Sequence, residues 1–181
     1  MDLWLASHDY RVRSLKQIGY CFMKSPMDGI GDCVAFATNT HLVALYFVEN
    51  RFEALSEFHK KWPKLKLQRT SEAEQFIMRA FEYPNELPVL AVGTPFQLTV
   101  WEFLRSIPSG TTMTYGEVAK LIARPRSARA VGRAVGSNEI AVVIPCHRVV
   151  SQGKLTGYRW GLDRKKLLLA RELSGKSILT S

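Results

Sequence analysis

A cysteine and a histidine stand side by side in the second half of the chain, at Cys146 and His147. Pro145 precedes them and follows the apolar run 141–144, so we expect a buried, strand-like segment that turns sharply and leaves Cys146 on an ordered loop. A thiol reacts as its thiolate, and a neighbouring imidazole or the charge of Arg148 would raise the thiolate fraction. The residues predict a nucleophilic cysteine beside its base. A buried structural cysteine is the alternative interpretation of the same dipeptide.

The other cysteines do not indicate a metal site. Cys21, Cys33 and Cys146 are an odd number without CxxC spacing or clustered histidines. Free thiols in a reducing compartment fit this pattern better than a disulfide scaffold or a zinc module. We therefore expect neither a metal nor another cofactor. We also expect an intracellular protein without a membrane partner, cytoplasmic or, in a eukaryote, nuclear, because neither a secretory signal nor a membrane-spanning apolar run occurs.

Positive charge is concentrated in one half of the chain. The 181 residues carry a net charge of +9, yet residues 1–90 hold 11 basic and 11 acidic side chains. Residues 91–181 hold 14 basic and 5 acidic side chains, so the whole excess lies there. A polyanion partner, most simply nucleic acid, is expected for this half. A generic basic surface is the alternative.

The first half has the pattern of a structural platform. Residues 18–24 and 34–48 are rich in β-branched and aromatic side chains, and Asn39–Thr40 is a plausible turn within the second stretch. These stretches predict a small antiparallel sheet. Two helices are also expected, one over 53–62 with Phe52, Leu55 and Phe58 on its apolar face, and one towards Phe81 that opens with a capping box of Ser71 and Glu74.

Two capping boxes open helices in the second half. They are Thr94-Pro95-Phe96-Gln97, where proline suits the first helical position, and Thr114-Tyr115-Gly116-Glu117. The short helix after the second box ends at Arg124-Pro125-Arg126, and another helix then runs over 127–136. Two short helices joined by a tight turn predict a helix-turn-helix.

The second helix of this pair has an unusual face. Ala128, Gly132 and Gly136 recur every four residues and make a strip with almost no side chain, flanked by Arg129 and Arg133. Glycine costs an exposed helix about 1 kcal/mol relative to alanine, so the glycines require a reason. Bare backbone beside arginines suits close approach to a phosphate-lined groove. Tight packing against another helix is the alternative.

From Gly93 to about Glu172 the sequence resembles the O6-alkylguanine-DNA alkyltransferase family. The matching pieces keep the family's order and spacing: Gly93-Thr94-Pro95-Phe96-Gln97, Thr114-Tyr115-Gly116-Glu117-Val118-Ala119, Ala128-Arg129-Ala130-Val131-Gly132, Pro145-Cys146-His147-Arg148-Val149-Val150 and Leu155-Thr156-Gly157-Tyr158-Arg159-Trp160-Gly161. The resemblance implies an α+β fold. Residues 1–88 would form a ribonuclease H-like domain, a small antiparallel sheet with helices. Residues 89–181 would form a mostly helical domain with a helix-turn-helix that binds DNA and accepts the alkyl group.

The resemblance also implies roles for individual residues. Cys146 would accept the alkyl group, irreversibly, from O6-alkylguanine and to a varying degree from O4-alkylthymine. His147 would take the thiol proton through a water, Glu172 would orient this histidine, and Asn138 would hold the water and the turn. Independently, Glu172 falls in the last turn of a helix predicted over 162–173, where a carboxylate opposes the helix dipole. An exposed position for Glu172 is the alternative.

Further roles concern DNA and the pocket. Arg129 would enter the base stack in place of a flipped base, and Tyr115 would rotate the neighbouring phosphate and donate to guanine N3. The family's helix-turn-helix lies in the minor groove of double-stranded alkylated DNA, with little sequence preference, and the protein is expected to be a monomer. The residues assigned to the DNA contact are Arg129 and Tyr115, by resemblance, and Ala128, Gly132, Arg133 and Gly136, from the face of the second helix. The residues assigned to the pocket are Pro145, Val149, Tyr158, Arg159 and Trp160.

Two departures from the family pattern are visible. Glu139 follows Asn138 where many members have proline, which suggests a less rigid turn and places a carboxylate in a basic face. Arg159-Trp160 stands where some relatives have small residues, so Trp160 is expected to narrow the pocket and favour methyl over benzyl groups.

Three other functions fit parts of the pattern. A binding-only relative would flag lesions without chemistry, but such relatives lack the acceptor cysteine that is present here. A cysteine hydrolase would need turnover and an oxyanion hole, for which the sequence has no signal. A plain helix-turn-helix regulator would bind a defined operator and would tolerate Cys146→Ala.

Overall fold

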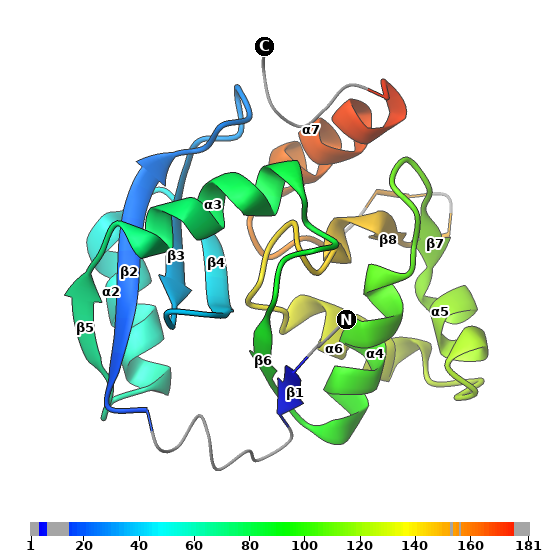
Figure 1. The fold of residues 1–181 in the computed structure, drawn as a ribbon. Helices are drawn as coiled ribbons and strands as arrows, with labels where there is room; N and C mark the ends of the chain where they lie inside the picture. Colours follow the sequence, from blue (N-terminus) through cyan, green and yellow to red (C-terminus); the bar gives the residue numbers. More distant parts are fainter. Residues whose placement is uncertain (1–3, 7–14, 153, 156, 176–181) are drawn as a thin grey trace.

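The computed structural model describes residues 4–6, 15–152, 154–155 and 157–175 (Figure 1). A small sheet with two helices makes up most of the first half, and the second half is mostly helical. Within the described ranges, no helix is both long and apolar enough to cross a bilayer.

A four-stranded sheet is the framework of the first half. Its strands are β2 (Gln17–Lys24), β3 (Asp32–Ala37), β4 (Leu42–Val48) and β5 (Lys66–Arg69), in the spatial order β4-β3-β2-β5. The first three pair antiparallel, as predicted, and the chain turns from β3 into β4 at Asn39–Thr40. β5 pairs parallel with β2, so the sheet is mixed. The sequence pattern missed β5 because Leu67 is its one apolar residue.

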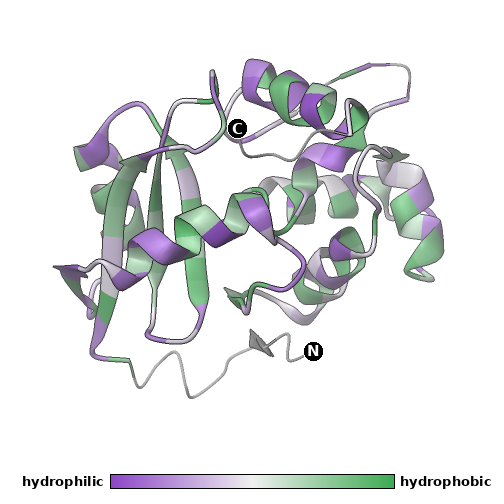
Figure 2. Ribbon diagram, turned by 45° about the horizontal axis from the view of Figure 1, so that its top comes forward, coloured by the Kyte–Doolittle hydropathy of each residue, from purple (hydrophilic) through white to green (hydrophobic). Residues whose placement is uncertain are grey.

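Two helices cover opposite faces of this sheet. α2 (Arg51–Lys61) lies behind the strands in Figure 1 and α3 (Glu72–Glu82) crosses in front. Phe36 of β3 stacks on Phe58 of α2, with ring centroids 3.8 Å apart, and Phe47 of β4 meets Phe81 of α3 edge-on at 6.2 Å. Neighbouring residues of a strand point to opposite faces of the sheet. Because helices cover both faces, every residue of β4 is buried. β3 and β4 are accordingly mostly hydrophobic in Figure 2.

Two details of the helix predictions are wrong. Phe52 is 86% exposed, because the buried face of α2 is formed by Ala54 and Phe58. Ser71 does not cap α3, because its backbone is already helical (φ −73°, ψ −26°). The hydroxyl of Thr70 instead accepts a hydrogen bond from the backbone of the first turn, at 3.4 Å. The capping residue is therefore one position earlier than the pattern predicts.

In the described residues of the second half, four α-helices are joined by short connecting elements. They are β6 (Leu90–Val92), α4 (Pro95–Arg105), β7 (Met113–Thr114), α5 (Tyr115–Leu121), α6 (Ala128–Gly136), the 3-10 turn η1 (Cys146–Arg148), β8 (Val149–Val150) and α7 (Leu162–Leu173). Both capping boxes predicted for α4 and α5 are present, with side-chain and backbone hydrogen bonds in each direction.

Trp101 packs α4 against α6. Its indole N–H donates to the Ala134 carbonyl on α6 (2.7 Å), and the side chain is 3% exposed. A Cβ atom on Gly93 would lie 2.7 Å from the indole ring, so this position requires glycine. α4 and α6 are thereby held together beneath the active-site segment.

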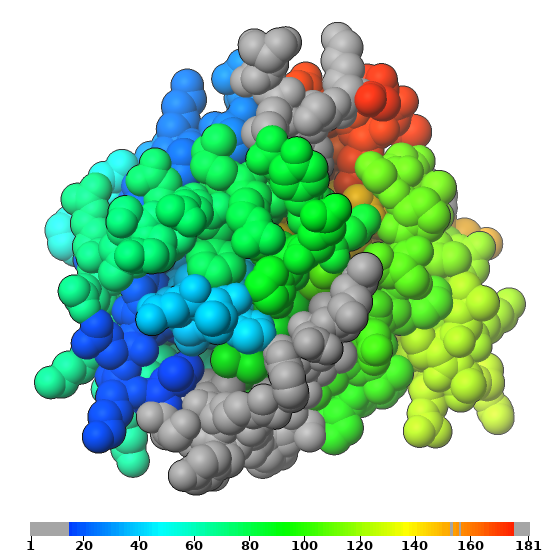
Figure 3. Space-filling view, in the orientation of Figure 1, coloured from blue at the N-terminus to red at the C-terminus, as the bar shows by residue number. Residues whose placement is uncertain are grey.

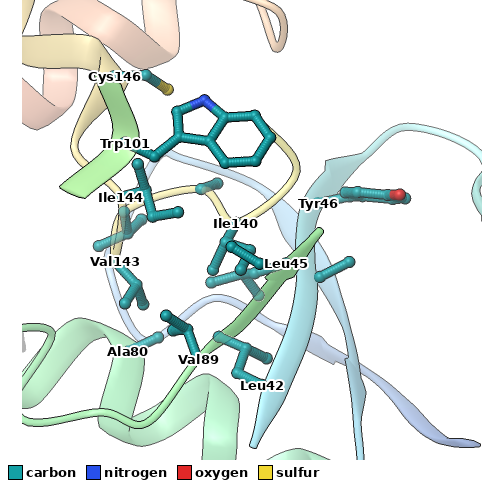
Figure 4. Close-up of a cluster of buried hydrophobic side chains, with 14 of the residues drawn as sticks. Leu42, Leu45, Tyr46, Ala80, Val89, Trp101, Ile140, Val143, Ile144 and Cys146 are labelled. Atoms are coloured by element: carbon teal, nitrogen blue, oxygen red, sulfur yellow. The ribbon is translucent and has the colours of Figure 1, made fainter. Parts of the chain in front are cut away.

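The two halves meet along β4 and share one continuous core. β1 (Trp4–Ala6) pairs parallel with β6, and Leu42 and Leu45 of β4 form single β-bridges to Val89 and Ile140. Figure 4 shows side chains of β4, of α3 and of the segment before Cys146 gathered in this core. A domain boundary between residues 88 and 89 stays a prediction.

Candidate active site and nucleic-acid interface

Two tight turns in succession present Cys146. A backbone hydrogen bond of 2.7 Å closes a three-residue turn around Val142, whose φ is 67°. The Cys146 N–H then donates to the Ile144 carbonyl (2.7 Å) around Pro145. A β-branched residue at positive φ is strained, so the surrounding core must hold Val142 in place. The strand predicted over 141–144 is therefore wrong, whereas the sharp turn at Pro145 is confirmed. Cys146 is buried, at 3% exposed.

Asn138 ties this turn to the thiol. Its side-chain amide is buried and donates to the carbonyls of Ile140 (3.3 Å) and Ile144 (3.0 Å) and to Cys146 Sγ (3.1 Å). Its Oδ1 accepts the Ile140 N–H at 2.9 Å. One side chain thus fixes the backbone on both sides of the turn and the position of the sulfur.

The Glu172 carboxylate lies at the centre of a buried polar cluster. Oε1 is 2.8 Å from His147 Nε2, and the Arg148 guanidinium donates to both oxygens at 2.8–3.1 Å. The Gly110 N–H donates to Oε2 (3.1 Å), and Arg148 also donates to the Ile107 carbonyl (2.6 Å). Glu172 is 8% exposed, so the exposed position considered from the sequence is wrong. A carboxylate is unfavourable near the C-terminus of α7 because of the helix dipole, and the hydrogen bonds that Glu172 accepts compensate for this.

The charge states within this cluster follow from its contacts. Burial alone would raise the pKa of Glu172, but the hydrogen bonds from His147 and Arg148 and their charges hold that pKa at about 2. Burial lowers the pKa of His147 and outweighs the carboxylate. The histidine is therefore neutral near pH 7, and its Nε2–H donates to the carboxylate. Nδ1, which has no hydrogen-bond partner among the described protein atoms, is then the nitrogen that can accept a proton.

The neighbours of Cys146 do not lower the pKa of its thiol below the usual value, as the sequence suggested they would. Burial raises its pKa to about 11, against the Asn138 hydrogen bond and the charges of Lys165 and Arg159, which lower it. Arg148 directs its guanidinium to Glu172 instead of the sulfur. The expectation of an increased thiolate fraction is therefore wrong for the free protein. For the sulfur to act as a nucleophile, this proton would first have to leave, because the thiolate is the nucleophilic form.

Lys165 is a site residue that the sequence does not reveal. It is 0% exposed, and its ammonium group donates to the carbonyls of Val149 (2.6 Å) and Gly157 (3.2 Å). In the sequence it is one of two adjacent lysines on an expected surface helix, so no local signal marks it as buried. Its charge favours the thiolate of Cys146 and ties α7 to the loop at Gly157.

Aromatic side chains line the loop beyond Cys146. Tyr158 lies edge-on to His147, with ring centroids 6.5 Å apart, and Trp160 lies edge-on to Tyr158 at 5.3 Å. Trp160 also meets Phe47 of β4 at 6.1 Å. We call the series His147, Tyr158, Trp160 and Phe47 the aromatic chain. It connects the catalytic candidates to the sheet. Among the other predicted pocket residues, Val149 is buried beside the site, whereas Arg159 extends towards the first half.

α5 and α6 form the projecting lobe that carries the predicted DNA contacts. The lobe is yellow-green at the right of Figure 3, and Arg129 and Arg133 are exposed on it. A Cβ atom on Gly132 would lie 3.7 Å from the ring of Tyr115, whereas one on Gly136 would meet nothing within 4 Å. A Cβ atom at 132 would thus make only an ordinary contact with Tyr115, so helix packing requires glycine at neither position. Ala128, at the start of the strip, is half-buried.

Tyr115 links this lobe to the pocket loop. It is the first residue of α5, and a Cβ atom on Gly157 would lie 3.4 Å from its hydroxyl. Burial raises the pKa of Tyr115, and the nearby Cys146 adds to the rise, so the phenol is protonated near neutral pH. It is thus a hydrogen-bond donor at the mouth of the site.

Comparisons with known proteins agree with this architecture. Residues 95–174 match the family model described as the DNA binding domain of 6-O-methylguanine DNA methyltransferase. A crystal structure of Mycobacterium tuberculosis OGT in complex with DNA is similar to this chain with a TM-score of 0.69 and 36% identity, over 86% of this chain and 93% of that one. The chain belongs to the O6-methylguanine-DNA methyltransferase family.

Curated members of this methyltransferase family are also similar in sequence. A methylated-DNA–protein-cysteine methyltransferase of Shigella flexneri is 53% identical over 89 residues, which are 49% of this chain and 52% of that protein. The bifunctional transcriptional activator and DNA repair enzyme Ada of Escherichia coli is 35% identical over 151 residues, 79% of this chain and 43% of that protein. The aligned part of the chain thus spans about half the length of these curated relatives.

Residues that could bind a metal do not gather anywhere in the described structure. Across residues 4–6, 15–152, 154–155 and 157–175, no group of three or more histidine, cysteine or acidic side chains has the geometry of a metal site. Cys21, Cys33 and Cys146 are free thiols, and burial raises the pKa of Cys33 to about 12. A structural role in the core explains Cys33.

Proposed function

We propose that this protein repairs DNA by transferring a methyl or other small alkyl group from O6-alkylguanine in duplex DNA to Cys146. The observation that carries the proposal is the buried contact of Asn138 with the sulfur of Cys146, next to the His147–Glu172 pair, in a member of this family. O4-alkylthymine, which has an alkyl group on an equivalent oxygen, is a second substrate. The reaction needs no cofactor, because the protein itself is the acceptor.

The chemistry is a displacement at carbon. His147 takes the proton of Cys146 at Nδ1 through a water. Glu172 orients the ring, because Nε2–H keeps its hydrogen bond to the carboxylate. The sulfur then bonds to the alkyl carbon, the carbon–O6 bond breaks, and its electron pair passes to guanine. The Tyr115 hydroxyl donates a hydrogen bond to guanine N3 as negative charge develops on the base. The thioether product leaves no thiol, so each molecule acts once.

The lesion reaches Cys146 outside the base stack. Flipping a base from a duplex costs a few kcal/mol, and Arg129 offsets part of that cost by entering the stack in its place. The strip of Ala128, Gly132 and Gly136 lies against the minor groove, and Arg133 contacts phosphate. These contacts read little sequence, and a monomer suffices for them.

Transfer of a labelled methyl group from an O6-methylguanine duplex tests this function. One methyl group per molecule should map to Cys146, and Cys146→Ser should bind the duplex without accepting the label. Multiple turnover on an ester or amide would favour a hydrolase. Binding without any methyl transfer would favour a protein that only marks lesions.

Trp160 sets the size of the alkyl group that enters. The side chain is 8% exposed and lies between Tyr158 and Phe47, which supports its assignment to the pocket wall. Trp160→Gly should accelerate inactivation by O6-benzylguanine at least several-fold while methyl transfer changes much less. Equal rates of benzyl inactivation for wild type and variant would contradict this assignment.

A further inference from the structure

Helix α2 of the first half makes two ion pairs with the second half. Glu57 and Lys61 are one helical turn apart, so they project from the same side of α2. Glu57 pairs with Arg159, and Lys61 Nζ lies 2.5 Å from Glu139 Oε2. We call these four residues the α2 bracket.

Both partners in the second half are sequence neighbours of groups at the alkyl site. Glu139 follows Asn138, which contacts the sulfur of Cys146. Arg159 lies between Tyr158 and Trp160, whose rings connect to His147. A shift of either partner would therefore move the turn that fixes the sulfur or the loop that walls the pocket.

Backbone contacts to β4 support one end of the bracket. The Leu45 N–H donates to the Glu139 carbonyl (2.8 Å), and the Ala141 N–H donates to the Leu45 carbonyl (3.0 Å). Glu139 is thus held through its main chain by β4 and through its side chain by α2. The carboxylate that departs from the family pattern at this position is restrained from the first half, so the turn is not loose.

The other end of the bracket has room to move. An open cleft of about 470 Å³ lies between α2 and the 159–164 segment. Arg159 crosses it, with its guanidinium carbon 5.5 Å from the ring centroid of Tyr46 and 5.8 Å from that of Trp160. Burial raises the pKa of Tyr46. The charges of Glu139 and Glu57 raise this pKa further, whereas the charge of Arg159 lowers it, so Tyr46 is close enough to both ion pairs to feel their charges. The Arg159 contacts, with the packing of Trp160 on Phe47, hold the loop at its present distance from the sheet.

We propose that Glu57 and Lys61 are positioning residues that set, from the first half, the placement of the Asn138 turn and of the Trp160 loop, and through them the range of alkyl groups that Cys146 accepts. The proposal rests on the alkyl transfer proposed above. Neither residue touches the reacting atoms. Loosening the α2 bracket widens the pocket, which favours bulky alkyl groups over methyl.

The test compares two rates in the full chain: methyl transfer from an O6-methylguanine duplex, and inactivation by free O6-benzylguanine. The double variant Glu57→Gln/Lys61→Gln should raise the benzyl-to-methyl rate ratio about three- to tenfold, in line with the modest energies of two partly exposed ion pairs. The exchange Lys61→Glu/Glu139→Lys restores that pair with reversed charges and should keep the ratio near the wild-type value. A merely structural role would lower both rates together.

The matched control is the exposed ion pair Arg51–Asp32, whose closest atoms are 3.6 Å apart and which lies entirely in the first half. Asp32→Asn should leave the ratio unchanged. Since free O6-benzylguanine needs no DNA contact, added salt should also accelerate benzyl inactivation of wild type but not of the double variant. If the ratio is unchanged in the double variant while wild type transfers methyl groups, the inference is overturned and the proposed function stands. A wild type that transfers no methyl group overturns the proposed function as well.

Discussion

At the scale of single residues, one carboxylate determines the charge state of the site. Glu172 receives hydrogen bonds from His147, from Arg148 and from the Gly110 backbone, and these contacts join α7 to the turn that holds Cys146. Cys146 keeps its proton in the free protein, because burial outweighs the nearby positive charges. The resting site is therefore neutral at the sulfur and at His147, and negative at Glu172.

Acid should unfold this protein through Glu172. Its pKa is about 2 in the folded protein and 4.5 in the absence of the fold, so its ionised form stabilises the fold above about pH 4.5 and that contribution is lost as the pH falls towards 2. The contribution is about 3 kcal/mol at most. His147, whose pKa is lowered by burial, acts in the same direction. Urea unfolding between pH 6 and 3 measures the effect.

The control for this prediction is the exposed carboxylate of Glu102 on α4. Glu172→Gln should have a smaller loss of unfolding free energy between pH 5 and 3 than wild type, whereas Glu102→Gln should follow wild type. Parallel pH curves for Glu172→Gln and wild type would refute the assignment.

At the scale of elements, the two glycines of α6 have different surroundings. Gly136 faces open space, and its φ is not in the positive range, so alanine fits there without strain. Gly136→Ala should raise the unfolding free energy by up to about 1 kcal/mol, because alanine favours the helix. It should also weaken duplex binding, since the added methyl group would separate the helix from the groove. Chemical denaturation and fluorescence anisotropy measure the two effects, and unaltered DNA affinity would contradict the proposed approach.

Patterns within a few residues predicted the helices and strands well, but they did not predict contacts between residues that are distant in the sequence. The boxes at Thr94 and Thr114 were correct because both partners lie within four residues. The expectation of a thiolate failed mainly because burial raises the pKa of Cys146. Arg148 also binds Glu172, 24 residues away, and no sequence pattern indicates which neighbour a guanidinium selects. For the same reason the sequence did not predict the burial of Lys165, which depends on how α7 packs.

At the scale of the whole molecule, the charge excess lies in the half that carries α5 and α6. Residues 91–181 have 14 basic and 5 acidic side chains. Duplex binding should therefore weaken steeply with salt and depend little on sequence. Arg133→Ala should reduce the slope of log affinity against log salt by about 1, whereas Arg79→Ala, an exposed change on α3, should leave it unaltered. Titrations at four salt concentrations with two unrelated duplexes decide this, and a salt-independent affinity would rule it out.

The shared core makes the first half part of the site. β4 bonds to the Asn138–Ala141 segment through Leu45, and Phe47 supports Trp160. A sheet without predicted catalytic residues thus determines where the catalytic candidates lie. Sequence motifs describe the second half alone and do not indicate this dependence.

The aromatic chain has one more consequence. Trp160 is separated from His147 by a single ring, that of Tyr158, so its emission senses packing and charge at the alkyl site. The described part of the molecule thereby contains an optical label of its own. If each molecule acts once, as proposed, we expect the fluorescence of Trp160 to distinguish spent from unspent copies without a radioactive substrate.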